Sequence, residues 1–94
     1  MNYKLVMKEG GYKIILKQSA RKFLERLPRQ IAKDIDSEII SLAKDPLNKK
    51  NVRKLTGSIF YRLRVGDYRI IFERQDKERT IAILKIGHRK DVYR

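Results

Sequence analysis

The hydrophobic residues of this 94-residue chain change their spacing near Val52, and this change restricts the fold more than any other feature. Before Val52, apolar side chains recur every three or four residues, as in amphipathic helices. After it they alternate, as in strands that bury one face. The pattern predicts one α+β domain over residues 1–94, with two helices packed on one face of a mainly antiparallel sheet.

Two short helices are predicted in the first half. Ser19 is a candidate N-cap for the first helix, and Pro28 ends it. Proline also suits the first position of the second helix, which is expected to run to Lys44 before Asp45-Pro46. The apolar stripes consist of Ala20, Phe23, Leu24 and Leu27 in the first helix and of Ile31, Ile35, Ile39 and Leu42 in the second. We interpret both helices as core packing and assign them no chemistry.

Two similar segments, Tyr3–Lys8 and Tyr12–Lys17, precede the helices and are typical of short strands. The glycines between them allow a hairpin. The alternative, which we favour, is a first strand at Tyr12–Lys17 and an N-terminal extension over residues 1–10, with Met7 as an alternative start. The expected element order is therefore strand, helix, helix, strand, strand, strand.

Gly66-Asp67 is a two-residue hairpin signal between the strands Phe60–Val65 and Tyr68–Phe72. A loop of this length fixes the register. The expected pairs are Val65 with Tyr68, Arg64 with Arg69, Leu63 with Ile70 and Arg62 with Ile71. In this register the three arginines share the face opposite the core. The apolar segment Thr80–Ile86, ended by Gly87, is typical of a strand in the middle of a sheet.

The charge of the chain indicates a polyanionic partner. Lys and Arg number 24 against 11 Asp and Glu, which gives a net charge of +13, yet 41% of the residues are hydrophobic and the chain should fold. Such an excess most often serves nucleic-acid binding, and plain solubility is the weaker alternative. Eight of the eleven arginines follow residue 52, so the function is expected on the sheet.

Several chemistries are excluded or unsupported by composition. The chain has no cysteine and one histidine, which leaves no disulfide, thiolate nucleophile or metal-ligand cluster, and we expect no cofactor. It has no apolar run long enough for a membrane span and no secretory signal, so we expect a cytoplasmic protein. A chain this short has little room for a deep pocket, and any active site should be open.

Opposed arginines on neighbouring strands repel each other unless an anion lies between them. Arg64 and Arg69, with Arg62 two residues along, therefore form a candidate phosphate clamp, although each could instead face solvent or pair with Glu73 or Asp67. Lys85 is expected on the same face.

Metal-free RNA cleavage also needs a base and an acid, and the titratable candidates near the C-terminus are His88 and Tyr93. Tyr93 could alternatively stack on a base. Taken alone, these patterns indicate an RNA-binding surface and only suggest catalysis.

Three motifs follow one another along the chain: Lys54-Leu55-x-Gly57, residues 61–72 (YRLRVGDYRIIF) and residues 88–93 (HRKDVY). The last of them lies at the C-terminal end. From about Gly11 to Arg94 the chain thereby resembles the RelE toxins of the RelE/ParE superfamily. The resemblance implies a toxin of a type II toxin-antitoxin module. Such a toxin cuts mRNA in the ribosomal A site, by attack of the 2′-hydroxyl on the adjacent phosphate, and is inhibited by a cognate antitoxin. We expect that antitoxin to carry an acidic or amphipathic segment.

Carried over by position, the functional side chains of the family fall on Arg62, Arg64, Arg69, Arg89 and Tyr93. We add Lys54, Lys85 and Lys90 as candidate RNA-binding residues. The best-known members have lysines where this chain has Arg62 and Arg64, and arginine cannot act as a general base. The base would then be Tyr93 or His88, unless electrostatics alone activate the 2′-hydroxyl.

Two alternatives stay open at this point. One is a ParE-like toxin that poisons DNA gyrase without cleaving RNA, which would share the fold. The other is a non-catalytic nucleic-acid-binding module. The arginine trio together with Tyr93 favours the ribonuclease.

Overall fold

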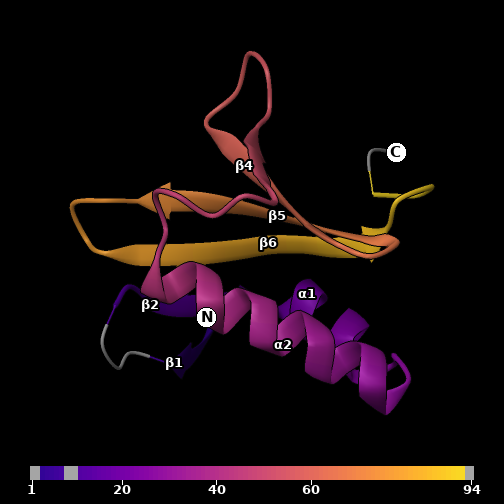
Figure 1. Ribbon diagram of the computed structural model, residues 1–94. Coiled ribbons are helices and arrows are strands. Elements are labelled where there is room, and N and C mark those ends of the chain that lie inside the picture. The colour runs from indigo at the N-terminus through magenta and orange to yellow at the C-terminus, as the bar shows by residue number, and fades with distance from the viewer. Residues whose placement is uncertain (1–2, 8–10, 93–94) are drawn as a thin grey trace.

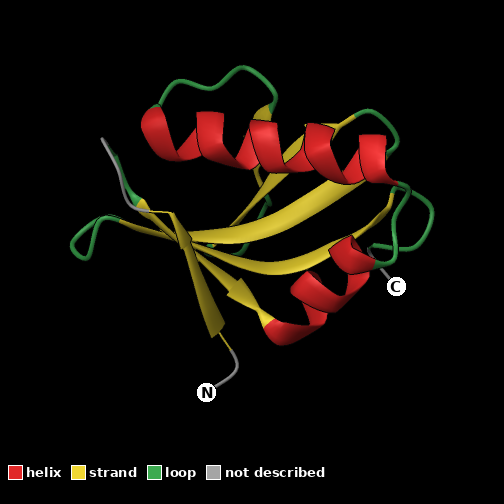
Figure 2. Ribbon diagram, turned by 90° about the horizontal axis from the view of Figure 1, so that it is seen from below, coloured by secondary structure: helices red, strands yellow, loops and turns green. Residues whose placement is uncertain are grey.

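The computed structural model describes residues 3–7 and 11–92, which form one sheet with two helices on one side (Figures 1 and 2). The elements are β1 (Tyr3–Met7), β2 (Lys13–Lys17), α1 (Gln18–Glu25), α2 (Arg29–Lys44), β3 (Val52–Lys54), β4 (Phe60–Val65), β5 (Tyr68–Gln75) and β6 (Thr80–His88). The strand order is β1-β2-β6-β5-β4-β3. Only β2 and β6 pair in parallel among these strands. The predicted α+β class, with both helices on one face, is confirmed.

The core lies between the helices and the sheet. Ile35 and Leu42 of α2 are fully buried, as are Leu63 of β4 and Phe72 of β5. The two neighbours of β6 cover its edges, and its apolar residues from Ile81 to Ile83 are buried. The expectation of a central strand at this position is therefore confirmed. Neither helix in the described part of the chain is long and apolar enough to cross a membrane.

The start of β2 is fastened to the end of α2 by a close backbone approach. The main-chain N–H of Tyr12 donates a hydrogen bond of 2.9 Å to the carbonyl oxygen of Ala43. A Cβ atom on Gly11 would lie 2.3 Å from the same oxygen, so only glycine fits there. This contact sets the position of α2 across the sheet.

The interpretation of residues 1–10 as an extension is wrong for Tyr3–Met7, which forms the antiparallel strand β1 against β2. Without β1, the free edge of β2 would present unpaired backbone groups, and the repeated strand pattern supplies a partner for them. The remaining residues of this segment, 1–2 and 8–10, lie outside the described part. The sheet therefore gains a strand at this edge.

Other details of the elements also differ from expectation. Ser19 is not the N-cap of α1, because the chain enters this helix directly from β2 and Lys17 takes the cap position without a side-chain hydrogen bond. The short strand β3 was not predicted as a separate element. The last strand continues through Gly87 to His88, since Gly87 pairs with Arg69 of β5.

The predicted hairpin register is confirmed at all four expected pairs, from Val65 with Tyr68 to Arg62 with Ile71. Gly66 has a φ of +57°, in the left-handed region that favours glycine. The β4–β5 turn therefore fixes which side chains of these strands face away from the helices.

Candidate nucleic-acid interface

Four arginines lie on the face of the sheet opposite the helices, and we call Arg53, Arg62, Arg64 and Arg69 the arginine surface. They form two cross-strand pairs, Arg53 with Arg62 between β3 and β4, and Arg64 with Arg69 between β4 and β5. Leu63, between Arg62 and Arg64, is fully buried on the helix side. Because side chains alternate along a strand, the arginines face the other way. Two adjoining pairs of like charge suit a surface that binds an anion.

A depression of about 460 Å³ opens on this surface. Its lining consists of Lys50, Asn51, Arg53, Arg62, Arg64 and Gly66, with no carboxylate among them. Within the described residues, the Nε atom of Arg62 is buried and has no hydrogen-bond partner. A buried donor without a partner is costly unless a ligand or water satisfies it. The lining is therefore suited to a polyanion.

Arg69 and Arg89 meet at the β4–β5 turn. The Nη1 atom of Arg69 donates to the carbonyl oxygens of Gly66 at 2.8 Å and Tyr68 at 2.9 Å. The main-chain N–H of Arg89 donates to the carbonyl oxygen of Asp67 at 2.7 Å, and its Nε lies 3.8 Å from a carboxylate oxygen of Asp67. Asp67 thus pairs with Arg89. The turn holds both arginines at one end of the arginine surface.

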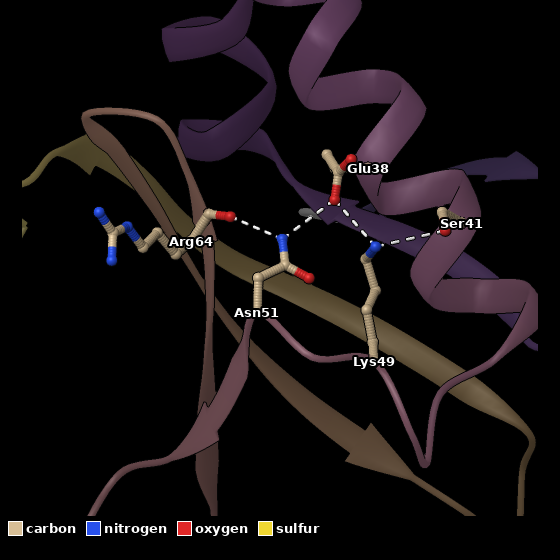
Figure 3. Close-up of polar contacts among 5 residues, drawn as sticks. All are labelled: Glu38, Ser41, Lys49, Asn51 and Arg64. Carbon is tan, nitrogen blue, oxygen red and sulfur yellow. Dashed lines mark hydrogen bonds and ion pairs between the residues drawn. The ribbon is translucent and has the colours of Figure 1, made fainter.

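Arg64 is held through its backbone by Asn51 (Figure 3). The Arg64 N–H donates to the Asn51 carbonyl at 2.9 Å, and Asn51 Nδ2 donates to the Arg64 carbonyl at 2.7 Å. Asn51 Nδ2 also donates to Glu38 Oε1 of α2 at 3.0 Å, and Lys49 Nζ lies 2.9 Å from the same oxygen. Hydrogen bonds from Lys49 and Asn51 lower the pKa of Glu38. The Arg64 side chain points away from this network.

His88 and Lys54 do not join the arginine surface. His88 pairs with Tyr68, and their rings meet edge to face at 5.6 Å on the helix side. Its Nδ1 accepts the Lys90 N–H at 3.2 Å, which engages that nitrogen within the turn. Lys54 pairs with Tyr61, one position out of phase with Arg53, and Lys54 Nζ donates to the Ser58 carbonyl.

Three further candidates have different outcomes. Lys85 pairs with Ile71, which is opposite Arg62, so Lys85 lies on the face of the arginine surface and is exposed. Lys90 is exposed in the turn after β6. Tyr93 lies outside the described residues.

Sequence reasoning missed Lys50 and Arg53 as parts of the site. Lys50 lies in the loop between α2 and β3, where no periodicity assigns a face, and β3 is three residues long, too short for alternation to reveal one. The excess of arginines after residue 52 was the available signal for Arg53. Among the described residues, no group of three metal-ligating side chains could hold a metal ion.

Comparisons with known proteins agree with this fold. Residues 14–93 match the family model described as the ParE toxin of the type II toxin-antitoxin system parDE. Toxin RelG of Mycobacterium tuberculosis is 33% identical over 86 residues, which cover 88% of this chain and 97% of that toxin.

Two solved toxin-antitoxin complexes have similar toxin folds. For an archaeal RelE–RelB complex from Pyrococcus horikoshii the TM-score is 0.76 at 29% identity, over 87% of this chain and 99% of the other. For the toxin-antitoxin complex RelBE2 from Mycobacterium tuberculosis the TM-score is 0.74 at 25% identity, over 83% of this chain and 98% of the other. The isolated RelE toxin of Escherichia coli, at 16% identity and a TM-score of 0.70, shares the fold.

The fold and these matches together define a toxin component of a type II toxin-antitoxin system. The chain belongs to the RelE/ParE superfamily and is a RelE-type toxin within it.

Proposed function

We propose that this toxin is a ribosome-dependent endoribonuclease that cleaves mRNA in the ribosomal A site and thereby stops translation. The observation that carries the proposal is the arginine surface around a depression of about 460 Å³ that no carboxylate lines. Guanidinium groups bind phosphate oxygens in bidentate fashion and stay charged at every working pH. They suit a site that stabilises the charge developing on a phosphate under attack.

The proposed reaction needs no metal ion. The 2′-hydroxyl of a nucleotide attacks the adjacent phosphorus, the bond to the 5′-oxygen of the next nucleotide breaks, and a 2′,3′-cyclic phosphate and a 5′-hydroxyl result. Arg64 and Arg69 stabilise the phosphorane, with Arg62 beside Arg64 on β4 and Arg89 at the same end of the sheet. Tyr93 is the candidate for proton transfer, because the ring of His88 lies on the helix side. The site is open, which fits an enzyme whose substrate the ribosome holds in place.

The proposed partner is a cognate antitoxin, since the solved relatives include RelE–RelB complexes. An acidic or amphipathic segment of that antitoxin would neutralise a chain with a net charge of +13. Covering the arginine surface would inhibit cleavage directly.

Primer extension on mRNA from a translating extract tests the proposal. The wild-type toxin should produce cuts in phase with codons, and Arg64→Ala should reduce cleavage roughly 10²-fold or more, as loss of a donor to a developing oxyanion does. Lys33→Ala, which removes one charge from the helix side, should leave cleavage unchanged.

The competing function is gyrase poisoning, which the match to a ParE family model favours. A supercoiling assay with purified gyrase separates the two. Uncut mRNA together with inhibited supercoiling would overturn the proposed ribonuclease activity in favour of this alternative.

A further inference from the structure

We propose that Lys50 and Arg53, together with Arg62, form a second phosphate subsite that binds the RNA phosphate next to the one held by Arg64 and Arg69. This inference rests on the proposed function, because it extends the same surface along the RNA strand. Lys50 and Arg53 lie on the loop before β3 and on β3 itself, so the subsite occupies the outer edge of the sheet.

The spacing of the two arginine pairs suits two neighbouring phosphates. The pair Arg53–Arg62 spans β3 and β4, and the pair Arg64–Arg69 spans β4 and β5, two residues further along β4. Neighbouring strands are about 4.8 Å apart and residues rise about 3.4 Å each, so the centres of the pairs are about 8 Å apart. A phosphate centred between the members of one pair would lie about 8 Å from the centre of the other. A polynucleotide, whose phosphates repeat along one backbone, can supply an anion to each.

The charges that line the depression also support a second phosphate subsite. Lys50, Arg53 and Arg62 line it and no carboxylate does, whereas Lys49, adjacent to Lys50 in the chain, is paired with Glu38. Within the described residues, none of the ion pairs involves Lys50, Arg53 or Arg62. The buried N–H at Nε of Arg62 has no hydrogen-bond acceptor within the described residues. Lys50, Arg53 and Arg62 therefore offer several hydrogen-bond donors, the unpartnered Nε of Arg62 among them, to the acceptor oxygens of a phosphate.

An oligonucleotide series with a rising number of phosphates tests the subsite on the whole protein. The probes are 2′-O-methyl uridine oligomers, which cannot be cleaved by 2′-attack, with one, two or three internucleotide phosphates. For wild-type toxin, affinity should rise at least fivefold from one phosphate to two. The double variant Lys50→Ala/Arg53→Ala should lose this gain, so that its affinities for the one-phosphate and two-phosphate probes differ by less than twofold.

The matched control is Lys22→Ala/Lys33→Ala, which removes two charges from the helices on the other side of the sheet. This control should keep the gain. The slope of log affinity against log salt for the longest probe should fall by about 0.7 in Lys50→Ala/Arg53→Ala, because the subsite neutralises one phosphate and each neutralised phosphate on a single strand contributes about 0.7. It should stay near the wild-type value in the control.

Three results would overturn the subsite: an unchanged gain in Lys50→Ala/Arg53→Ala, an equal loss in the helix-side control, or equally tight binding of a glutamate peptide of the same charge. The last would assign the surface to an acidic protein partner. Failure of the proposed function looks different, because a toxin that cuts no mRNA in the translating extract can still show the phosphate-dependent gain.

Discussion

Arg64 and Arg69 pair with each other across β4 and β5, but their side chains differ in exposure and in hydrogen bonding. The Arg64 side chain is exposed, while Arg69 is half-buried and donates to two carbonyls of the β4–β5 turn. Each such hydrogen bond contributes about 0.5–1.5 kcal/mol to stability. Arg69 is thus both a candidate phosphate ligand and a support of the hairpin.

We therefore predict that Arg64→Ala and Arg69→Ala both lose growth inhibition, and that only Arg69→Ala also loses roughly 1–3 kcal/mol of unfolding free energy, for its two hydrogen bonds. Urea unfolding of both purified variants measures the difference. Equal stability of the two variants would contradict a supporting role for Arg69, and full toxicity of soluble Arg64→Ala would contradict the site.

Among the elements, α2 and β4 are joined by the network of Glu38, Lys49 and Asn51 (Figure 3). The main-chain carbonyl of Asn51 accepts from the Arg64 N–H, and its side-chain Nδ2 donates to both the Arg64 carbonyl and Glu38, so this amide group links the helix to the arginine surface. Asn51→Ala removes two side-chain hydrogen bonds and should cost about 1–3 kcal/mol. It should also weaken cleavage although Asn51 carries no charge.

The same network predicts a dependence on pH. The pKa of Glu38 is lowered below its ordinary 4.5, so its contribution to stability is present above that pH and is lost as the pH falls through the lower folded-state value. Glu38→Gln should flatten the decline of thermal stability below pH 4.5, measured as Tm from pH 7 to pH 3. Asp34→Asn, which changes another carboxylate of α2, should keep the wild-type decline.

How far the sequence predicted these elements depended on how local each signal was. The β4–β5 register followed from the two-residue loop Gly66-Asp67, because loop length and alternation act between neighbouring residues. The parallel pairing of β2 with β6 joins segments more than sixty residues apart, and no local pattern encodes it. The position of His88 on the helix side also depends on its pairing with Tyr68. Arg53 was missed for the same reason, since only its pairing with Arg62 shows on which face of the sheet it lies.

For the whole molecule, the net charge of +13 and the paired arginines oppose folding while they serve binding. Like charges directly opposite each other on a sheet destabilise it by roughly 0.2–1 kcal/mol for each pair. A change of 1 kcal/mol corresponds to about 4–8 °C in Tm for a domain of this size. Neutralising one exposed member of each pair should therefore raise Tm by several degrees at low salt.

We predict that Tm of the wild-type toxin rises with NaCl, which screens the repulsion, and rises further in phosphate of equal ionic strength, because an anion that binds only the folded state stabilises it. Arg53→Ala/Arg64→Ala should start from a higher Tm at low salt and lose the increment specific to phosphate. Lys22→Ala/Lys33→Ala, with the same net charge, should keep that increment. If both variants kept it, the anion would bind elsewhere. If Arg53→Ala/Arg64→Ala started from a lower Tm, the arginines would stabilise the sheet and their conflict with folding would be refuted.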